Sequence, residues 1–165
     1  MDLPEILVTQ VREQKVVIFL GAGASLGAKS AGGKRAPSTQ QLGVQLADKF
    51  LGGKYKDHPL HQIAEYSISE SDLGTVQTFI KDLLEPLEPT SAHLKVCDFA
   101  WHGIATTNYD RLIEEAYAQN KNSVQVPRPL IENTDKVEDN SREAENVLLL
   151  KLHGCVTRSQ TQHIP

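Results

Sequence analysis

The sequence predicts an α/β fold in which a parallel sheet carries helices on its faces. Three apolar runs, at residues 16–20, 103–106 and 147–152, are continuous rather than alternating, which is typical of strands buried on both faces. Segments with helical spacing separate these runs, and strands that alternate with helices favour parallel pairing. Residues 153–165 contain no further predicted strand. We therefore expect an incomplete, N-terminal portion of a larger doubly wound domain.

The first fifty residues predict a helix, a strand, a long loop and a second helix. Residues 3–14 carry apolar side chains at four-residue spacing, which favours an amphipathic helix. Residues 16–20 predict a strand covered on both faces, and the loop 21–37 is rich in glycine, alanine, serine and lysine. Ser38 and Gln41 then have the spacing of a capping box, so a helix is expected to begin there.

Helices dominate the predicted middle of the chain. The expected elements are helices at 59–68, 72–87, 90–101 and 112–117 and strands at 103–106, 123–126 and 147–152. Pro86 and Pro89 should stop the second of these helices, since proline cannot continue a helix. Thr90 or Ser91 is expected to cap the third helix, and Asp110 the fourth.

The composition excludes several classes of protein. The 165 residues form one domain's length with 39% hydrophobic and 23% charged residues, and a net charge of -4 predicts no direct binding to nucleic acid. Two cysteines without a CxxC pair exclude a self-contained four-cysteine zinc site, so no metal is expected. The longest nearly apolar stretch, residues 16–28, is interrupted by glycines and too short to span a membrane. We expect a protein of a reducing compartment, the cytoplasm.

A glycine-rich turn follows the first predicted strand. Gly21 and Gly23 let the backbone turn sharply and approach a phosphate group closely. The next glycine is Gly27, so the pattern is GxGxxxG rather than the dehydrogenase fingerprint. The alternative interpretation is a tight strand-to-loop turn. Likewise, the basic residues Lys29, Lys34 and Arg35 of the loop are either solvated charges or electrostatic aids to ligand binding.

Two further polar motifs end the other apolar runs. Thr106-Thr107-Asn108-Tyr109-Asp110 places an amide at a strand tip, where parallel sheets build their ligand crevice. Local structure accounts for Asp110 as a helix cap but gives Asn108 no role. His153 follows the most apolar strand, and a histidine there is either a structural hydrogen-bonding residue or a general base near neutral pH.

Together, Gly21-Ala22-Gly23-Ala24-Ser25, the 106–110 segment and Lys151-Leu152-His153-Gly154 resemble the sirtuin-like family, whose members bind NAD and break its bond between ribose and nicotinamide. The resemblance implies a Rossmann-like sirtuin-like NAD-binding domain over residues 1–165, truncated at its C-terminus, with a cofactor-binding loop at 21–37. It implies that Asn108 orients water or ribose, that His153 takes a proton, that Asp110 accepts a hydrogen bond from the nicotinamide amide, and that Ser25 contacts phosphates. The cofactor-binding residues implied in this way are Gly21, Ala22, Gly23, Ala24, Ser25, Pro37, Thr107, Asn108, Asp110 and His153.

Two departures from the family's deacylases decide which activity is expected. Ala36-Pro37-Ser38 stands where deacylases have Pro-Asp-Phe-Arg. In the second motif, where deacylases have Gln-Asn-Ile-Asp, this chain has Thr107 in place of Gln and Tyr109 in place of Ile. The Thr-Thr-Asn-Tyr-Asp form resembles that of NAD hydrolases from bacterial anti-phage defence systems. The resemblance thus implies an NAD+ hydrolase that uses NAD as substrate and yields nicotinamide with ADP-ribose or cyclic ADP-ribose.

Two alternatives remain open: an NAD-dependent protein deacylase, and a non-catalytic module that senses NAD or ADP-ribose. The expected partners are NAD and either a homo-oligomer or a further C-terminal sensor or effector domain, without a membrane.

Overall fold

The computed structural model describes residues 3–132, 135 and 145–158. Its centre is a four-stranded sheet in the order β1-β4-β6-β5, and every neighbouring pair is parallel. The strands are β1 (Val17–Leu20), β4 (Gly103–Thr106), β5 (Val126–Leu130) and β6 (Asn146–Lys151). The α/β fold class with a parallel sheet is thereby confirmed.

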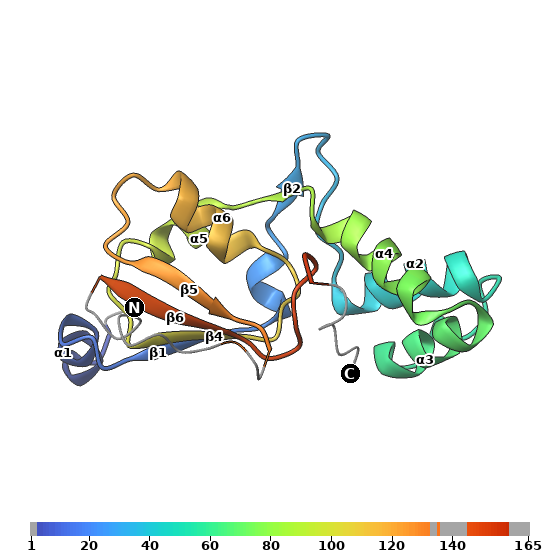
Figure 1. Ribbon diagram of the computed structural model, residues 1–165, viewed down its shortest axis with the longest axis horizontal. Helices are drawn as coiled ribbons and strands as arrows, with labels where there is room; N and C mark the ends of the chain where they lie inside the picture. Colours follow the sequence, from blue (N-terminus) through green and yellow to red (C-terminus); the bar gives the residue numbers. More distant parts are fainter. Residues whose placement is uncertain (1–2, 133–134, 136–144, 159–165) are drawn as a thin grey trace.

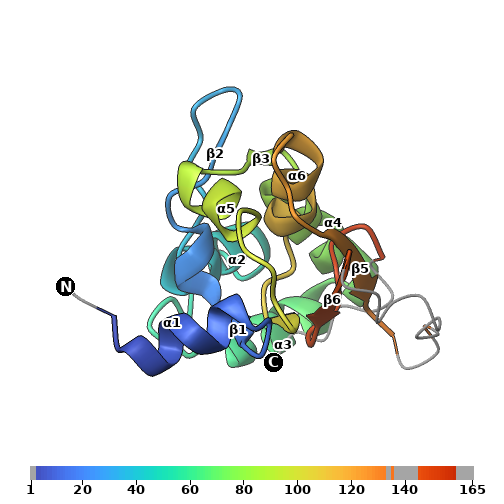
Figure 2. The same cartoon turned by 90° about the vertical axis from the view of Figure 1, so that its left-hand side faces the viewer.

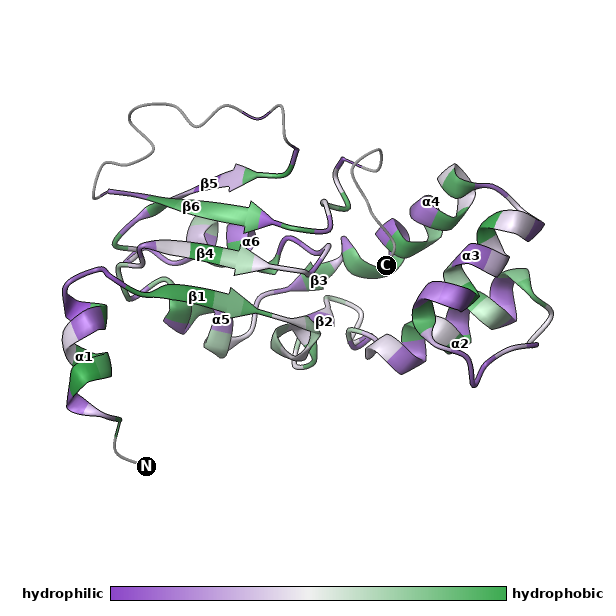
Figure 3. Ribbon diagram, turned by 90° about the horizontal axis from the view of Figure 1, so that it is seen from below, coloured by the Kyte–Doolittle hydropathy of each residue, from purple (hydrophilic) through white to green (hydrophobic). Residues whose placement is uncertain are grey.

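Helices α5 (Ser91–Val96) and α6 (Leu112–Gln119) lie on one face of the sheet (Figures 1 and 2). Ile104, Val147 and Leu149 point to this face and pack with α6 in one buried cluster. The opposite face is open in the described part of the chain (Figure 3). Phe19 and Val17 are 61% and 54% exposed there.

The expectation that β1 is covered on both faces is therefore wrong. Its continuous apolar run favoured cover on both faces, but Ile18 and Leu20 alone face the cluster beneath the helices. In the described part of the chain, β1 lies at an edge of the sheet and pairs with β4. Helix α1 (Glu5–Arg12), which precedes it, has no buried residue. Figure 3 shows α1 at the end of the sheet, away from the other helices.

The other edge strand, β5, lies later in the sequence than predicted. Residues 123–126 were the expected strand, whereas β5 spans Val126–Leu130 and contains Pro127 and Pro129. Proline lacks the N–H that a central strand needs, but an edge strand pairs on one side only and tolerates it. In the described part of the chain, β5 pairs with β6 alone, which explains how a proline-rich segment forms a strand.

A helical unit stands beyond the carboxyl ends of the strands (Figures 1 and 3). It consists of α2 (Thr39–Phe50), α3 (Leu60–Glu70) and α4 (Leu73–Leu84). The predicted capping box is confirmed, because Gln41 N donates to Ser38 Oγ at 3.2 Å and Ser38 N donates to Gln41 Oε1 at 2.9 Å. Leu46, Ile63 and Val76 are buried between these helices in a second hydrophobic cluster.

Short elements connect the two parts. The predicted turn after β1 contains a 3-10 helix, η1 (Ala22–Ser25), and a two-stranded antiparallel ribbon pairs β2 (Lys29–Ser30) with β3 (Leu87–Glu88). The helix predicted at 72–87 therefore ends earlier, at Leu84, ahead of Pro86. The helix predicted at 90–101 likewise ends at Val96. The sheet and the helical unit flank the region where the three motifs meet.

Candidate functional site

The three motifs meet at one end of the sheet because they end three adjacent strands. Leu20, Thr106 and Lys151 lie at the same level in β1, β4 and β6. The residues that follow each strand therefore leave the sheet side by side, at the edge where open α/β sheets bind ligands. Leu152 N donates to the Thr106 carbonyl at 2.9 Å, which holds the His153 turn against the end of β4.

A cavity of about 200 Å³ opens at this point. Seven of the ten predicted cofactor-binding residues line it, namely Ala22, Ser25, Pro37, Thr107, Asn108, Asp110 and His153. Gly21, Gly23 and Ala24 are not in its lining. The helical unit closes the opposite side with Leu42, Leu60 and Leu84, apolar residues that carried no sequence signal of a ligand site.

A larger hollow of about 630 Å³ shares the wall Ala36, Pro37 and Ser38 with this cavity. Arg35 lines the larger hollow, together with polar side chains of α2. Lys29 and Lys34 line neither space. Of the three basic loop residues, Arg35 alone is thus placed beside the site in the described structure.

Asn108 is held in one orientation by two acceptors from the glycine-rich turn. Its Nδ2 donates to the Gly21 carbonyl at 3.0 Å and to Ser25 Oγ at 2.8 Å. Its backbone N donates to Thr106 Oγ1 at 3.0 Å. Both amide hydrogens of the side chain are used in this way, so Oδ1 is the group that remains to accept a hydrogen bond from a ligand.

Ser25 connects Asn108 to Asp110. The Ser25 hydroxyl donates to Asp110 Oδ2 at 2.6 Å, while it accepts from Asn108. Asp110 Oδ1 accepts from Leu112 N, the first residue of α6, at 3.1 Å. The N-cap of α6 is Arg111, so the prediction of Asp110 as the cap is wrong by one residue. Ser25 and Asp110 are both buried. The hydroxyl predicted to contact phosphates is thus engaged with two side chains of the site.

Tyr109 and His153 lie beside each other in the cavity wall. Their ring centroids are 6.2 Å apart with planes tilted by 38°. Burial raises the pKa of Tyr109 to about 12, so its phenol is neutral at physiological pH. Gly154 follows with φ +88, a backbone conformation that glycine adopts without strain and that turns the chain directly after His153.

Gly21 and Gly23 leave open space beside the turn. A Cβ added at either residue would meet no atom within 4 Å, and neither residue has a positive φ. Neither packing nor backbone conformation therefore requires glycine here.

Two buried polar residues beside the site were missed by sequence reasoning. The side chain of Lys151 donates a hydrogen bond to the backbone carbonyl of Asp110. The sequence feature that could have indicated its role is a lysine directly after three leucines of a buried strand. His93 lies close enough to Asp110 for the carboxylate to raise the pKa of His93, although burial has the larger effect and lowers it. Among the described residues, no group of three potential metal ligands occurs, and no helix is long and apolar enough to cross a membrane.

Comparisons with known proteins bear on the same segments. A family model described as "SIR2-like domain" matches residues 102–164, which include the 106–110 and 151–154 motifs. The chain is also similar to "NAD(+) hydrolase ThsA" of Bacillus cereus (strain MSX-D12), with 27% identity over 152 residues. This alignment covers 89% of the chain but 29% of the relative's length.

The match covers β4, α6, β5 and β6, and two of the three motifs that suggested the family lie within it. The predicted resemblance of this chain to the sirtuin-like family is confirmed.

Proposed function

We propose that this chain provides the NAD+-cleaving site of an NAD+ hydrolase. The observation that carries the proposal is the orientation of Asn108, whose amide hydrogens are bound to Gly21 and Ser25 so that Oδ1 is left for a ligand. Asn108 and His153 line the same cavity, so an orienting acceptor and a base are available together. The similarity to an NAD(+) hydrolase supports the choice of substrate.

The cavity dimensions fit a division of the substrate between two spaces. A volume of about 200 Å³ is below the range of about 300–1,000 Å³ usual for whole-ligand pockets, so it takes only the nicotinamide and its ribose. The pyrophosphate then lies along the Gly21–Ser25 turn, where the glycines leave open space. Asp110 accepts a hydrogen bond from the nicotinamide amide, since its carboxylate is one of the cavity's acceptors.

The reaction needs orientation and shelter more than a strong catalyst, because the leaving group already carries a positive charge. The bond between C1′ and the nicotinamide nitrogen breaks, and its electron pair neutralises that nitrogen. A water oxygen, oriented by Asn108 Oδ1, bonds to C1′, and His153 accepts the proton that the water releases. The products are nicotinamide and ADP-ribose; attack by a second group of the same molecule in place of water gives the cyclic form.

Incubation of the purified chain with NAD, followed by chromatography of released nicotinamide, tests this proposal. We expect Asn108→Ala and His153→Ala each to lower turnover at least about 100-fold, in the range usual for a lost general base or orienting group. Asn122→Ala and His102→Ala are matched controls, because both residues are exposed and line neither space. Thermal unfolding verifies that each variant is folded.

Each alternative outcome has a distinct meaning. A folded Asn108→Ala variant with wild-type turnover contradicts the mechanism. Thermal stabilisation by NAD without release of nicotinamide indicates a sensing module, and release that requires an acylated peptide indicates a deacylase. A role in anti-phage defence and a cytoplasmic location stay predictions from the motif form and the composition.

A further inference from the structure

Lys151 is a charged residue on the buried face of β6, where the other side chains are apolar. Val147, Leu149 and Lys151 alternate along β6 and are all buried, and the first two pack in the cluster beneath α6. Lys151 is 3% exposed. Removing an ammonium group from water costs several kcal/mol unless partners compensate, so this lysine requires a physical account.

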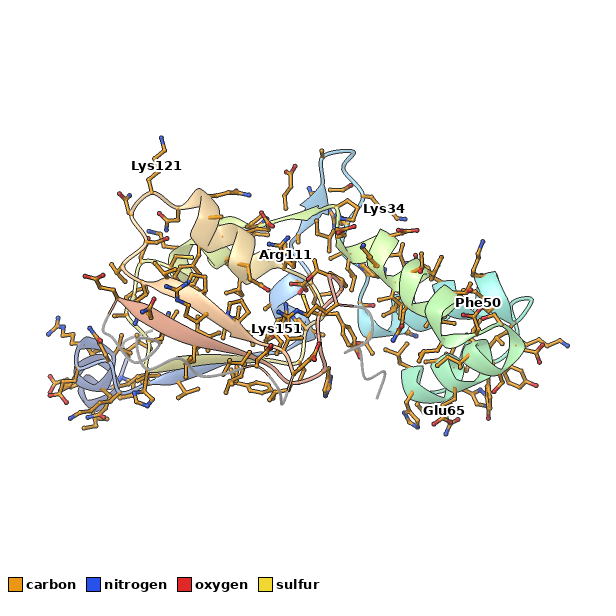
Figure 4. The ribbon with its side chains drawn as sticks, in the orientation of Figure 1. Lys34, Phe50, Glu65, Arg111, Lys121 and Lys151 are labelled. Atoms are coloured by element: carbon orange, nitrogen blue, oxygen red, sulfur yellow. The ribbon has the colours of Figure 1, made fainter. Side chains whose placement is uncertain are left out.

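The partners of Lys151 belong to the segment that follows Asn108. Its Nζ donates to Glu114 Oε1 at 3.1 Å and to the backbone carbonyl of Asp110. The two side chains are 1% and 11% exposed, so the pair is buried. Glu114 is in the first turn of α6. The ammonium group of Lys151, a residue labelled in Figure 4, therefore joins the end of β6 to the start of that helix.

From Asp110 a continuous set of hydrogen bonds reaches the site. The Asp110 carboxylate accepts from Ser25, and Ser25 accepts from the Asn108 amide. The last two residues before His153 in the chain are Lys151 and Leu152, and Leu152 N is bonded to the end of β4. One buried cation thus connects the segments that carry Asn108, Ser25 and His153.

We infer that Lys151 is a positioning residue that fixes Asn108 through Asp110 and Ser25; this inference rests on the proposed function. Stability alone is a weak reason for the ion pair, because replacing both partners of a buried pair by uncharged groups is often neutral or stabilising. The pair instead holds the Asp110 carbonyl at one place relative to β6. Its loss should misplace the Asn108 oxygen by a fraction of an ångström, and errors of that size slow a reaction that depends on orientation.

The test uses the double variant Lys151→Met/Glu114→Gln, which removes the contact without leaving a buried unpaired charge. We expect kcat for nicotinamide release to fall 10- to 100-fold, KM to change less than threefold, and the melting temperature to stay near that of the wild type. Arg111→Met/Glu115→Gln is the matched control, because this pair lies on the same turn of α6 at 3.3 Å but is exposed. Its kcat should equal that of the wild type.

A folded Lys151→Met/Glu114→Gln variant with wild-type kcat overturns the inference. If this variant does not fold, Lys151→Gln alone decides, since it removes the ammonium group that binds the Asp110 carbonyl but keeps a hydrogen-bond donor for Glu114. A lower kcat at unchanged KM then supports the positioning role, and an unchanged kcat refutes it.

A second measurement separates this inference from the proposed function. The Nδ2 resonances of Asn108 in ¹⁵N–¹H spectra, assigned by their loss in Asn108→Ala, report the amide's hydrogen bonds without any substrate. They should shift in the double variant, while those of Asn122 do not. If the wild type releases no nicotinamide, the proposed function fails and the spectra still decide whether Lys151 fixes Asn108; unshifted resonances refute that link.

Discussion

Replacing Ser25 with alanine removes one hydroxyl that serves two partners at once. The change deletes the 2.6 Å hydrogen bond to Asp110 Oδ2 and the 2.8 Å bond that Asn108 Nδ2 donates. Ser25 is 8% exposed, so water has little access to the groups left behind. We therefore expect a loss of stability as well as a loss of activity.

The expected size follows from the two bonds. A hydrogen bond to a charged acceptor contributes about 1.5–3 kcal/mol to stability and a neutral one about 0.5–1.5 kcal/mol. Their combined loss is therefore ~2–4 kcal/mol, less any relief from a rearranged Asn108. At about 3 °C per kcal/mol for a domain of this size, the melting temperature should fall by about 6–12 °C.

Circular dichroism on heating, with and without NAD, measures this effect. Ser30→Ala is the matched control, because Ser30 Oγ lies in the same loop and accepts only the exposed bond from Lys34 N at 3.2 Å. Its melting temperature should change by less than about 2 °C, as is usual for surface substitutions. A Ser25→Ala protein with unchanged melting temperature and weakened NAD binding would refute the stabilising role and favour the phosphate contact implied by the family resemblance.

Two further predictions concern the pH dependence of stability and the sidedness of the sheet. Burial holds the pKa of His93 below its ordinary 6.5, so this residue contributes stability above pH 6.5 that is lost as the pH falls from 6.5 towards the folded-state pKa. His93→Asn, whose Oδ1 can still accept from Thr90 N, should reduce the drop in melting temperature between pH 7.5 and 5.5, and an unaltered drop would contradict this account. Leu149→Ala should cost about 2–5 kcal/mol in urea unfolding because Leu149 is fully buried, whereas Leu150→Ala, on the other face and 38% exposed, should cost less than about 1.5 kcal/mol. Equal losses would show that both faces are covered in solution.

The convergence of the three motifs could be predicted from the sequence. Each motif ends an apolar run, and the carboxyl ends of parallel strands meet at one edge of a sheet. The capping box of Ser38 and Gln41 was also predictable, since a cap depends on residues within one turn. The sequence thus determined the fold class and seven residues of the cavity lining, but not the apolar wall formed by Leu42, Leu60 and Leu84.

Tertiary structure alone decided which partners these local features meet. An apolar run does not show whether helices cover both faces of its strand, and the packing of helices on one face alone of the described sheet left Phe19 exposed on the other. Pro127 and Pro129 argue against a strand until β5 is seen to lie at an edge of the described sheet. The ion pair of Lys151 with Glu114 joins residues 37 positions apart, and the hydrogen bond of Ser25 with Asp110 spans 85. Such contacts depend on how distant segments of the chain come together in the fold. The periodicity of a short sequence segment carries no information about these distant partners.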